Sequence, residues 1–426
     1  MTAGFLVVAL FVLLFLRVPI AISLGLSAIL TLLMFSEQSM VSLTQRFFFS
    51  LQGVPPLLAI PFFILAGALM TTGGVAKRMI AFANSLVGHF RGGLAMAALL
   101  ACALFAAVSG SSPATVVAVG SIMIAGMARS GYTREFAAGL ICNAGTLGIL
   151  IPPSIVMVVY GAVTETSIGD LFIAGLVPGL MLTGLLMIAV AFLARRLGLP
   201  RQPRADWRTV WQTGRSAIWG LLLVVIILGG IYSGVFTPTE AAAVSAAYAF
   251  VIAVFVYGDV RLREIPKVMA GAAKTTAMLM FIIGNAYLFA FVLTTEQVPQ
   301  TMSQWITDQG LPPWVFLIVL NVLLLAAGSF MEATSVVLIF APIMFPIAVA
   351  LGIDPIHLGI VMTVNMEIGM ITPPVGLNLF VTSGISGLPV TKVIRAALPW
   401  LVVLLAALII LTYVPWVSLV LPRALD

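Results

Sequence analysis

The sequence predicts an all-α polytopic membrane protein built as a two-fold internal repeat, and three observations support this prediction. Hydrophobic residues form 62% of the 426-residue chain and charged residues only 8%, which is more apolar than a soluble core requires. Apolar runs of the length that crosses a bilayer recur throughout the chain. A glycine followed by a proline pair interrupts such runs at residues 148–153 and again at 369–374. Corresponding interruptions in two halves indicate the binding site of a membrane transporter.

The distribution of charge argues against a nucleic-acid partner. The formal net charge of +6 comes from Lys and Arg in a few short loops rather than from one continuous basic face. The chain begins without a basic segment ahead of its first apolar run, so we expect a retained span rather than a cleaved signal peptide. Cys102 and Cys142 lie inside predicted spans without CxxC spacing, and we expect no redox role, no structural metal and no organic cofactor.

About ten membrane spans are predicted, each from a run of ~20 mostly apolar residues. The spans are placed at 3–16, 19–35, 56–73, 135–163, 171–193, 217–235, 240–257, 277–294, 358–385 and 397–421. Two other segments, 37–54 and 259–274, mix apolar and charged residues. Such a mixture is typical of helices that lie along a membrane surface.

Two further apolar segments, 93–127 and 313–350, are predicted to be re-entrant helical hairpins. Basic residues flank the first on both sides, so both of its ends are expected in the cytoplasm. These residues are Lys77, Arg78, Arg91, Arg129 and Arg134. The second lies in a stretch, 275–391, that contains no Lys or Arg, so both of its ends are expected outside. Its flanking acidic residues are Glu296, Asp308 and Asp354.

The two halves are expected in opposite orientations across the membrane, because an odd number of predicted spans separates the hairpins. The first repeat covers 1–200, with the hairpin 93–127 and a broken span at 135–163. An arginine-rich cytoplasmic linker follows at 201–216. The second repeat covers 217–426, with the hairpin 313–350 and a broken span at 358–385. The repeat is thus predicted to be inverted in topology, with both termini outside.

Polar, helix-breaking clusters lie in the middle of both hairpins and both broken spans, at 109–115, 143–153, 328–335 and 365–378. Proline removes a backbone donor and blocks helix continuation, so each proline pair frees carbonyl groups that need partners in a medium without water. Those carbonyls and the nearby hydroxyls are hard oxygen ligands that suit Na⁺. The half-helices that begin beyond the breaks direct positive dipole ends to the same region, which favours an anionic carboxylate.

Each of these features also has a purely structural interpretation. Small residues in spans often serve close helix packing, and single proline kinks are common in membrane helices. Glu332 and Glu367 could bind a coupling cation or a proton, or could pair with neighbouring hydroxyls and amides. Glu240 is expected in the first turn of its span. His89 and His357 lie near span ends, where we expect solvated side chains.

Taken together, the motifs resemble the large membrane subunit of TRAP transporters, the tripartite ATP-independent periplasmic transporters, of the DctM type. The resemblance covers essentially the whole chain and rests on residues 109–115, 143–153, 331–346 and 368–380. It implies an elevator-type member of the ion-transporter superfamily in a bacterial inner membrane. The implied function is Na⁺-coupled uptake of organic acids, such as C4-dicarboxylates or sialic acid. The implied partners are a small four-helix membrane subunit and a periplasmic substrate-binding protein.

The resemblance also implies roles for residues at the hairpin tips and breaks. Na⁺ ligands are expected at Ser109, Ser111, Ser112, Asn143, Gly145, Thr146, Gly328, Thr334, Gly369 and Thr372. Substrate contacts are expected at Ser112, Thr115, Pro152, Glu332, Ser335, Pro373 and Asn378. Neither hairpin nor the second broken span contains Arg or Lys, so amides, hydroxyls and bound Na⁺ must recognise the anion.

Three other functions remain to be compared with this one. A dicarboxylate or citrate symporter of the same plan would use Na⁺ or H⁺ and would need no binding protein. An intramembrane enzyme would need a paired aspartate, a Ser–His pair or an HExxH motif; the predicted spans contain no Asp, so we expect no enzyme activity. A passive channel can also be lined by polar broken helices, but it cannot drive uptake against a gradient.

Overall fold

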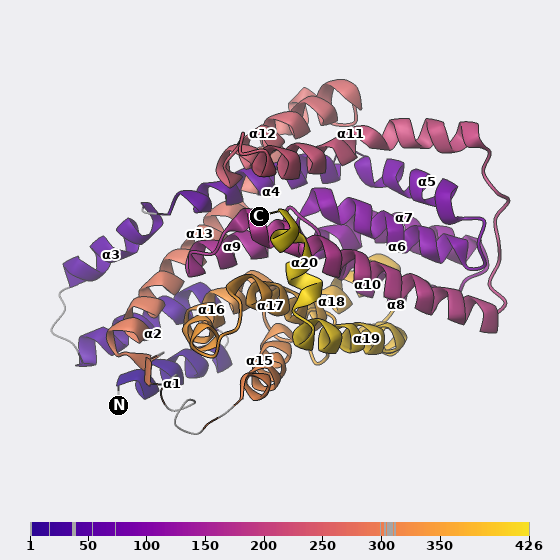
Figure 1. Ribbon diagram of the computed structural model, residues 1–426. Helices are drawn as coiled ribbons and strands as arrows, with labels where there is room; N and C mark the ends of the chain where they lie inside the picture. The colour runs from indigo at the N-terminus through magenta and orange to yellow at the C-terminus, as the bar shows by residue number, and fades with distance from the viewer. Residues whose placement is uncertain are drawn as a thin grey trace.

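The computed structural model describes residues 2–16, 18–35, 40–52, 54–72, 74–298, 300–301, 304, 310 and 312–425. All regular secondary structure in these ranges is helical (Figure 1). Asp308, one of the acidic residues that flank the second predicted hairpin, lies outside the described residues.

The helices divide between the two halves of the chain. Those of the first half are α1 (Thr2–Phe15), α2 (Ile20–Phe35), α3 (Met40–Gln52), α4 (Ala59–Thr72), α5 (Val75–Val87), α6 (Gly93–Ser109), α7 (Ser112–Arg129), α8 (Arg134–Ala144), α9 (Ile155–Thr164) and α10 (Ile168–Arg196). Those of the second half are α11 (Trp207–Tyr232), α12 (Pro238–Val251), α13 (Ile265–Thr295), α15 (Pro313–Gly328), α16 (Ala333–Ala350), α17 (Pro355–Gly369), α18 (Leu377–Ser386), α19 (Val390–Tyr413) and α20 (Trp416–Leu425). Short turns of 3-10 helix lie at Pro55–Leu58, Gly145–Ile149 and Leu262–Glu264, and a π-helical turn at Ile252–Val256.

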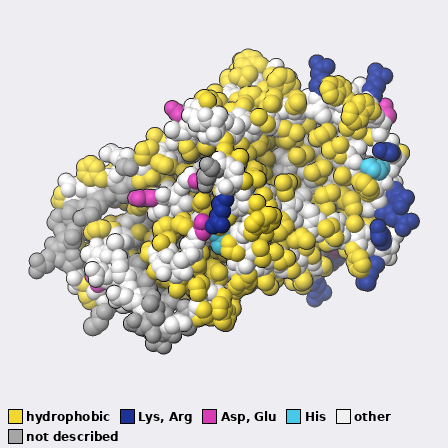
Figure 2. Space-filling model, in the orientation of Figure 1, with side chains coloured by type: hydrophobic (Ala, Val, Ile, Leu, Met, Phe, Trp, Pro, Cys, Tyr) yellow, Lys and Arg dark blue, Asp and Glu magenta, His cyan; other side chains and the backbone are white. Residues whose placement is uncertain are grey.

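Eight helical segments among the described residues are long and apolar enough to cross a membrane. They are Pro55–Thr72, Ser112–Arg129, Ile168–Arg196, Trp207–Tyr232, Pro238–Val256, Leu262–Thr295, Ala333–Ala350 and Val390–Tyr413. Hydrophobic side chains cover the middle of the visible face, and Lys and Arg gather at the end where α10 leads into α11 (Figure 2). An all-helical, multi-span membrane protein is thereby confirmed. Six of these eight segments correspond to predicted spans, and the other two, Ser112–Arg129 and Ala333–Ala350, are the second arms of the predicted hairpins. The remaining four predicted spans are α1, α2 and the two broken spans, whose helices are individually shorter.

One predicted boundary in the second half is wrong. The expected surface helix 259–274 and the expected span 277–294 lie largely in a single helix, α13, because no proline interrupts the chain between Pro266 and Thr295. In the first half, Pro55 and Pro56 stand between α3 and α4 and form a separate 3-10 turn. Proline lacks the N–H group that a continuous helix needs there.

The C-terminal span also differs from its predicted range of 397–421. It begins earlier, at Val390, and ends at Tyr413, and α20 follows as a separate helix. Val414 has a φ of −121° and a ψ of 78°, an extended conformation that the following Pro415 favours. This residue pair therefore ends α19.

Two helices begin where the sequence predicts none. α11 starts at Trp207, inside the interval 201–216 assigned to the linker. α5 is absent from the prediction because Lys77 and Arg78 interrupt its apolar run. The Arg78 guanidinium pairs with the Asp259 carboxylate at 2.5 Å and lies over the Tyr257 ring, so α5 is anchored to the loop that precedes α13.

Capping side chains define two helix starts. Asp206 accepts hydrogen bonds from the backbone N–H and the hydroxyl of Thr209 at the start of α11, and the hydroxyl bond lowers the pKa of the Asp206 carboxyl. Thr237 and Glu240 form a capping box at the start of α12, where Glu240 Oε2 accepts from the Thr237 N–H at 2.8 Å. Glu240 is thus a first-turn residue, as predicted.

The two hairpins pack against both broken spans. The first hairpin, α6 and α7, packs against α8, and the second, α15 and α16, packs against α17. Across the two halves, α7 packs against α18 and α16 packs against α9. The hairpins and broken spans therefore form one continuous body in which hairpin tips and helix breaks can meet.

Candidate functional site

The tip of the first hairpin gathers neutral oxygen atoms. α6 ends at Ser109, Gly110 turns the chain with a φ of 60°, and α7 begins at Ser112. Ser109 Oγ lies 2.8 Å from Thr115 Oγ1, and the Thr115 hydroxyl lies 2.9 Å from the Ser111 carbonyl oxygen. The side chains of Ser109, Ser112 and Thr115 are buried. Hard, uncharged oxygens of this kind suit an alkali cation.

The helix break of the first half, residues 145–154 between α8 and α9, is called the first break and packs directly on this tip. A Cβ atom at Gly148 would lie 2.7 Å from both the Ser111 carbonyl oxygen and Thr115 Oγ1. A Cβ atom at Gly110 would lie 2.8 Å from the Pro153 carbonyl oxygen. Only glycine allows the two backbones to approach this closely. The structure therefore brings the oxygen cluster to the first proline pair.

The other predicted ligands of the first half organise the break itself. The Thr146 hydroxyl donates to the Asn143 carbonyl oxygen at 2.7 Å, and Gly145 leaves room for a valine of α7. The Asn143 amide nitrogen donates to the carbonyl one turn earlier at 2.8 Å and to the Ala397 carbonyl of α19 at 3.3 Å. Asn143 Oδ1 is buried and has no hydrogen-bond partner among the described residues.

A carboxylate caps the tip of the second hairpin. Glu332 Oε1 accepts from the Thr334 hydroxyl at 2.9 Å, and Oε2 accepts from the Ser335 N–H at 3.3 Å, so Glu332 caps α16. Glu332 thus pairs with a neighbouring hydroxyl and a backbone amide. The second break is residues 370–376, between α17 and α18. The backbone of the second hairpin touches α17 where this break begins, because a Cβ atom at Gly369 would lie 2.7 Å from Gly328 Cα.

The second break is joined to the second hairpin by its backbone. The Gly376 N–H donates to the Ser329 carbonyl oxygen at 2.8 Å. The Thr372 hydroxyl donates to the Ile368 carbonyl oxygen at 2.7 Å. Since that bond uses the hydroxyl hydrogen, the lone pairs of Thr372 Oγ1 stay available to a cation.

The two breaks differ in exposure. Pro152 and Pro153 are buried, and Pro373 is half-buried. Beyond it, Pro374 is exposed, and Phe380 is 50% exposed. The second break therefore borders the surface of the protein, whereas the first is enclosed.

The two halves meet at a hydrogen bond between two predicted substrate residues. Asn378 Nδ2 donates to Ser112 Oγ at 2.6 Å, and both side chains are fully buried. Ser112 begins α7 and Asn378 lies in the first turn of α18; neither helix has a side-chain hydrogen bond at its N-cap. Two positive helix ends therefore converge, which favours an anion. In α18 the Asn378 and Leu379 N–H groups already donate to the carbonyl oxygens of Met370 and Gly376, and α7 carries Pro113 in its first turn.

Glu367 and Asn365 lie outside the predicted ligand sets, yet both are buried on α17. The Glu367 carboxyl lies near Ile149 and Leu150 of the first break, and its Oε1 is buried without a hydrogen-bond partner among the described residues. Their signal in the sequence is the presence of polar side chains in an otherwise apolar helix, one turn or less before Gly369.

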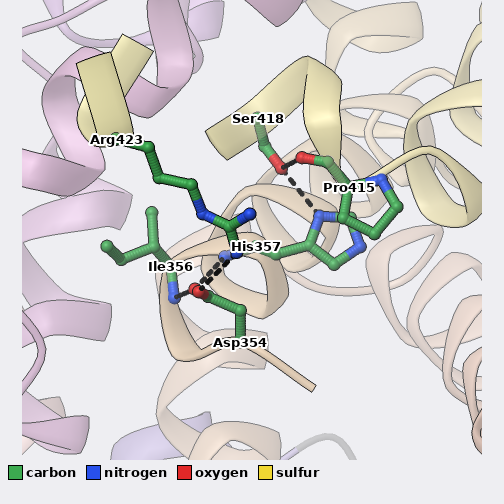
Figure 3. Close-up of polar contacts among 6 residues, drawn as sticks. All are labelled: Asp354, Ile356, His357, Pro415, Ser418 and Arg423. Atoms are coloured by element: carbon green, nitrogen blue, oxygen red, sulfur yellow. Dashed lines mark hydrogen bonds and ion pairs between the residues drawn. The ribbon is translucent and has the colours of Figure 1, made fainter. Parts of the chain in front are cut away.

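His357 is not the solvated residue that the sequence predicts. It is 2% exposed, with Nδ1 2.7 Å from Ser418 Oγ (Figure 3). Its Nε2 lies 3.2 Å from the Thr412 carbonyl oxygen. The prediction fails because α20, which covers this end of α17, is separated from it in sequence. Asp354, at the start of α17, also pairs with Arg423 of α20 at 3.8 Å.

Comparisons with known proteins identify the family of the chain. The profile of the family described as "Tripartite ATP-independent periplasmic transporter, DctM component" matches residues 7–417. The chain is 65% identical over 401 residues to the C4-dicarboxylate TRAP transporter large permease protein DctM of Pseudomonas aeruginosa, covering 94% of each chain. It is 57% identical to the protein of the same name from Vibrio cholerae, over 96% of this chain and 94% of that one.

Among solved structures, the YdaH transporter of Alcanivorax borkumensis has a similar fold. Its TM-score is 0.66 at 17% identity, over 91% of this chain and 90% of that one, so the likeness concerns the fold alone. The family profile and the close relatives are decisive for identity, and they describe a transporter permease rather than an enzyme. The chain belongs to the DctM component family of the tripartite ATP-independent periplasmic transporters.

Proposed function

We propose that this chain is the large permease of a Na⁺-coupled importer of C4-dicarboxylates in a bacterial inner membrane. It would work with a small four-helix membrane subunit and a periplasmic substrate-binding protein. The observation that carries the proposal is the convergence of two uncapped helix N-termini at the Ser112–Asn378 hydrogen bond, between two oxygen-rich hairpin tips. This centre offers two positive helix ends to an anion and neutral oxygens to a cation.

A dicarboxylate suits this centre because its two carboxylates can each face one helix N-terminus. Each helix end carries roughly half a positive charge. Basic side chains are absent from residues 93–127, 313–350 and 358–385, so helix ends, amides and hydroxyls would do the recognition. The C4-dicarboxylate class is further supported by the printed names of the relatives at 65% and 57% identity. We favour it over sialic acid for this reason.

Sodium ions would offset the charge of the substrate inside the membrane. In the first half, the Ser109 and Thr115 hydroxyls and the Ser111 carbonyl are the donors already gathered in one place. In the second half, Thr372 and the carbonyls freed by the proline pair are the corresponding donors. An unaccompanied dianion would be costly to bury, so cation and substrate are expected to bind together.

An elevator movement is supported by the way the helices associate. The hairpins and broken spans pack as one body, whereas α4 packs mainly against α12 and α13, and α13 packs against α2. These four helices form the support, which meets the body where α4 contacts α6 and α9 and where α13 contacts α16. The body would carry the site across the membrane while the support stays in place. The first break is enclosed and the second borders the protein surface. This difference is the one expected if the structure represents one end of the movement, with the site accessible from one side only.

The inverted arrangement predicts that both ends of the second hairpin face the periplasm. In a chain with Cys102 and Cys142 replaced by alanine, Glu296→Cys and Asp354→Cys are both expected to react with an impermeant thiol reagent added outside intact cells. The reason is that no Lys or Arg lies between these positions to hold either end in the cytoplasm.

Arg91→Cys and Arg129→Cys are the matched positions for the first hairpin. They should react only after the cells are permeabilised, because basic residues flank that hairpin on both sides. If positions 296 and 354 react from opposite sides, α15 and α16 do not form a re-entrant hairpin and the inverted repeat is wrong.

The proposed function predicts that the complete three-component system accumulates succinate under a Na⁺ gradient. Proteoliposomes with Na⁺ outside and K⁺ inside should concentrate radiolabelled succinate above its external level, with saturable kinetics. A proton gradient without Na⁺ should not replace the Na⁺ gradient. Uptake that only equilibrates succinate would indicate a passive channel, and uptake that ignores Na⁺ would exclude the proposed coupling.

A further inference from the structure

A line of buried and half-buried hydrogen bonds connects the end of α19 to the second broken span. Asn321 of α15 donates its Nδ2 to Thr412 Oγ1 at 3.0 Å. Asn365 of α17 donates its Nδ2 to Asn321 Oδ1 at 2.7 Å. His357 Nε2 lies 3.2 Å from the Thr412 carbonyl oxygen and must donate to it, since a carbonyl can only accept. Side chains of α15 and α17 thus hold the last turn of α19.

His357 is itself held by the C-terminal helix. Its Nδ1 lies 2.7 Å from Ser418 Oγ, and the Ser418 hydroxyl also lies 3.0 Å from the Pro415 carbonyl oxygen (Figure 3). Thr412 stands in the last turn of α19, where backbone carbonyls have no partner within the helix. His357 supplies that missing donor, so it fixes the position of Thr412.

The network determines which way the Asn365 amide points. Asn365 Nδ2 also donates to the Val361 carbonyl oxygen at 2.8 Å. Because that carbonyl cannot donate, the amide nitrogen and not its oxygen must face it, and Asn321 Oδ1 accepts the other hydrogen. Asn365 Oδ1 is left fully buried, without a hydrogen-bond partner in the part of the chain that the structure describes. A buried acceptor without a partner is costly, which suits a group that receives a ligand.

The first broken span repeats this arrangement with different anchors. Asn143 directs its amide nitrogen to the carbonyls of Gly139 and Ala397, and its Oδ1 is likewise buried without a partner in the described ranges. The Ala397 carbonyl of α19 accepts a hydrogen bond from the Asn143 amide nitrogen, as Asn321 Oδ1 does from the Asn365 amide nitrogen. In both cases the acceptor fixes the orientation of the amide. Each half of the molecule holds one carboxamide oxygen in a defined direction ahead of its break.

We propose that Asn365 Oδ1 is a ligand of the coupling cation and that Asn321, Thr412 and His357 are positioning residues for it. The proposal rests on the proposed function, since it assigns a ligand to the Na⁺-coupled site. A cation is the favoured occupant because an ionised C4-dicarboxylate has no carboxyl hydrogen to offer a carbonyl oxygen. Asn365 lies one helical turn before Gly369, where α17 ends at the second break.

A Na⁺ titration of thermal unfolding tests this proposal independently of transport. In the purified full-length chain, NaCl should raise the unfolding midpoint relative to KCl at equal ionic strength, because a ligand that binds the folded state stabilises it. Asn365→Ala should raise the half-saturating Na⁺ concentration roughly five- to 150-fold. Asn321→Ala should raise it at least about fivefold, because the ligand loses its anchor. Asn321→Asp keeps an acceptor for the Asn365 amide and should restore a near-normal Na⁺ response.

Asn285→Ala is the matched control, since Asn285 of α13 also donates to the carbonyl one turn earlier, at 2.7 Å. It should keep the normal half-saturating Na⁺ concentration even where its midpoint in KCl falls. A purely structural role for Asn365 and Asn321 would lower their midpoints in KCl and leave the Na⁺ response unchanged, which would overturn the proposal. If Asn365→Ala does not fold, the contrast between Asn321→Ala and Asn321→Asp decides the same question.

The unmodified chain separates this proposal from the proposed function. A normal protein whose midpoint ignores Na⁺ would show that the Na⁺ coupling is wrong, and the ligand assignment would fall with it. A normal protein that responds to Na⁺, with an Asn365→Ala variant that responds equally well, would overturn only the ligand assignment.

Discussion

Reconstituted alone in proteoliposomes, the chain is expected to take up no measurable succinate. The family to which it belongs forms one component of a tripartite system. The centre of its candidate site is buried and carries no basic side chain, so free succinate would have to lose its hydration without a strong compensating charge. Delivery by a loaded binding protein would overcome that barrier. The measurement is radiolabelled succinate uptake under an inward Na⁺ gradient.

Adding back the partners provides the control for this experiment. The small membrane subunit and the succinate-loaded binding protein together should restore uptake, whereas either one alone should not. Robust uptake by the isolated chain would contradict the prediction. It would instead support the symporter alternative, which shares the same architecture and needs no binding protein.

Thr372→Val is expected to raise the half-saturating Na⁺ concentration for uptake roughly five- to 150-fold. The substitution keeps the shape of the side chain but removes Oγ1, whose lone pairs stay available after its hydrogen bond to the Ile368 carbonyl. Losing one ligand at a buried cation site costs about 1–3 kcal/mol, and about 1.4 kcal/mol is a factor of ten in binding. Uptake by the complete system is measured as a function of external Na⁺.

Thr183→Val is a suitable control because the Thr183 hydroxyl makes the same one-turn bond, to the Gly179 carbonyl at 2.8 Å, in α10. It should leave the Na⁺ requirement unchanged. Thr412 cannot serve this purpose, since its hydroxyl accepts from Asn321. An unchanged Na⁺ requirement in Thr372→Val, or uptake driven equally well by protons, would point instead to Glu332 and Glu367 as proton carriers.

Local chemistry made the hairpin tips and the helix breaks predictable from the sequence. α6 ends at Ser109 and α17 at Gly369, where glycine, serine and proline clusters interrupt the apolar runs. These residues act on their own neighbours, since glycine permits the turn and proline removes a helix donor. The family is also readable from the same motifs, because they are long and lie in both halves. For these features no distant contact had to be known.

Helix continuity was less predictable, because it depends on which interruptions the chain tolerates. The start of α13 carries Lys267 and Lys274, which suggested a separate surface helix, yet the helix runs on through them. Pro399 is accommodated inside α19, whereas Pro415 marks its end. The charges and prolines are visible in the sequence, but their effect depends on how the surrounding helices pack.

The amino-acid sequence by itself determined the membrane class, the family and the breaks at the hairpin tips and at the two proline pairs. Only the tertiary structure decided that Asn378 meets Ser112, that Asn321 joins Thr412 to Asn365, and that His357 is buried under α20. The physical reason is that lipid and protein interior are both apolar, so a span that is apolar all round does not reveal which face contacts a neighbour. Polar contacts between distant spans therefore become known only once the helices are packed.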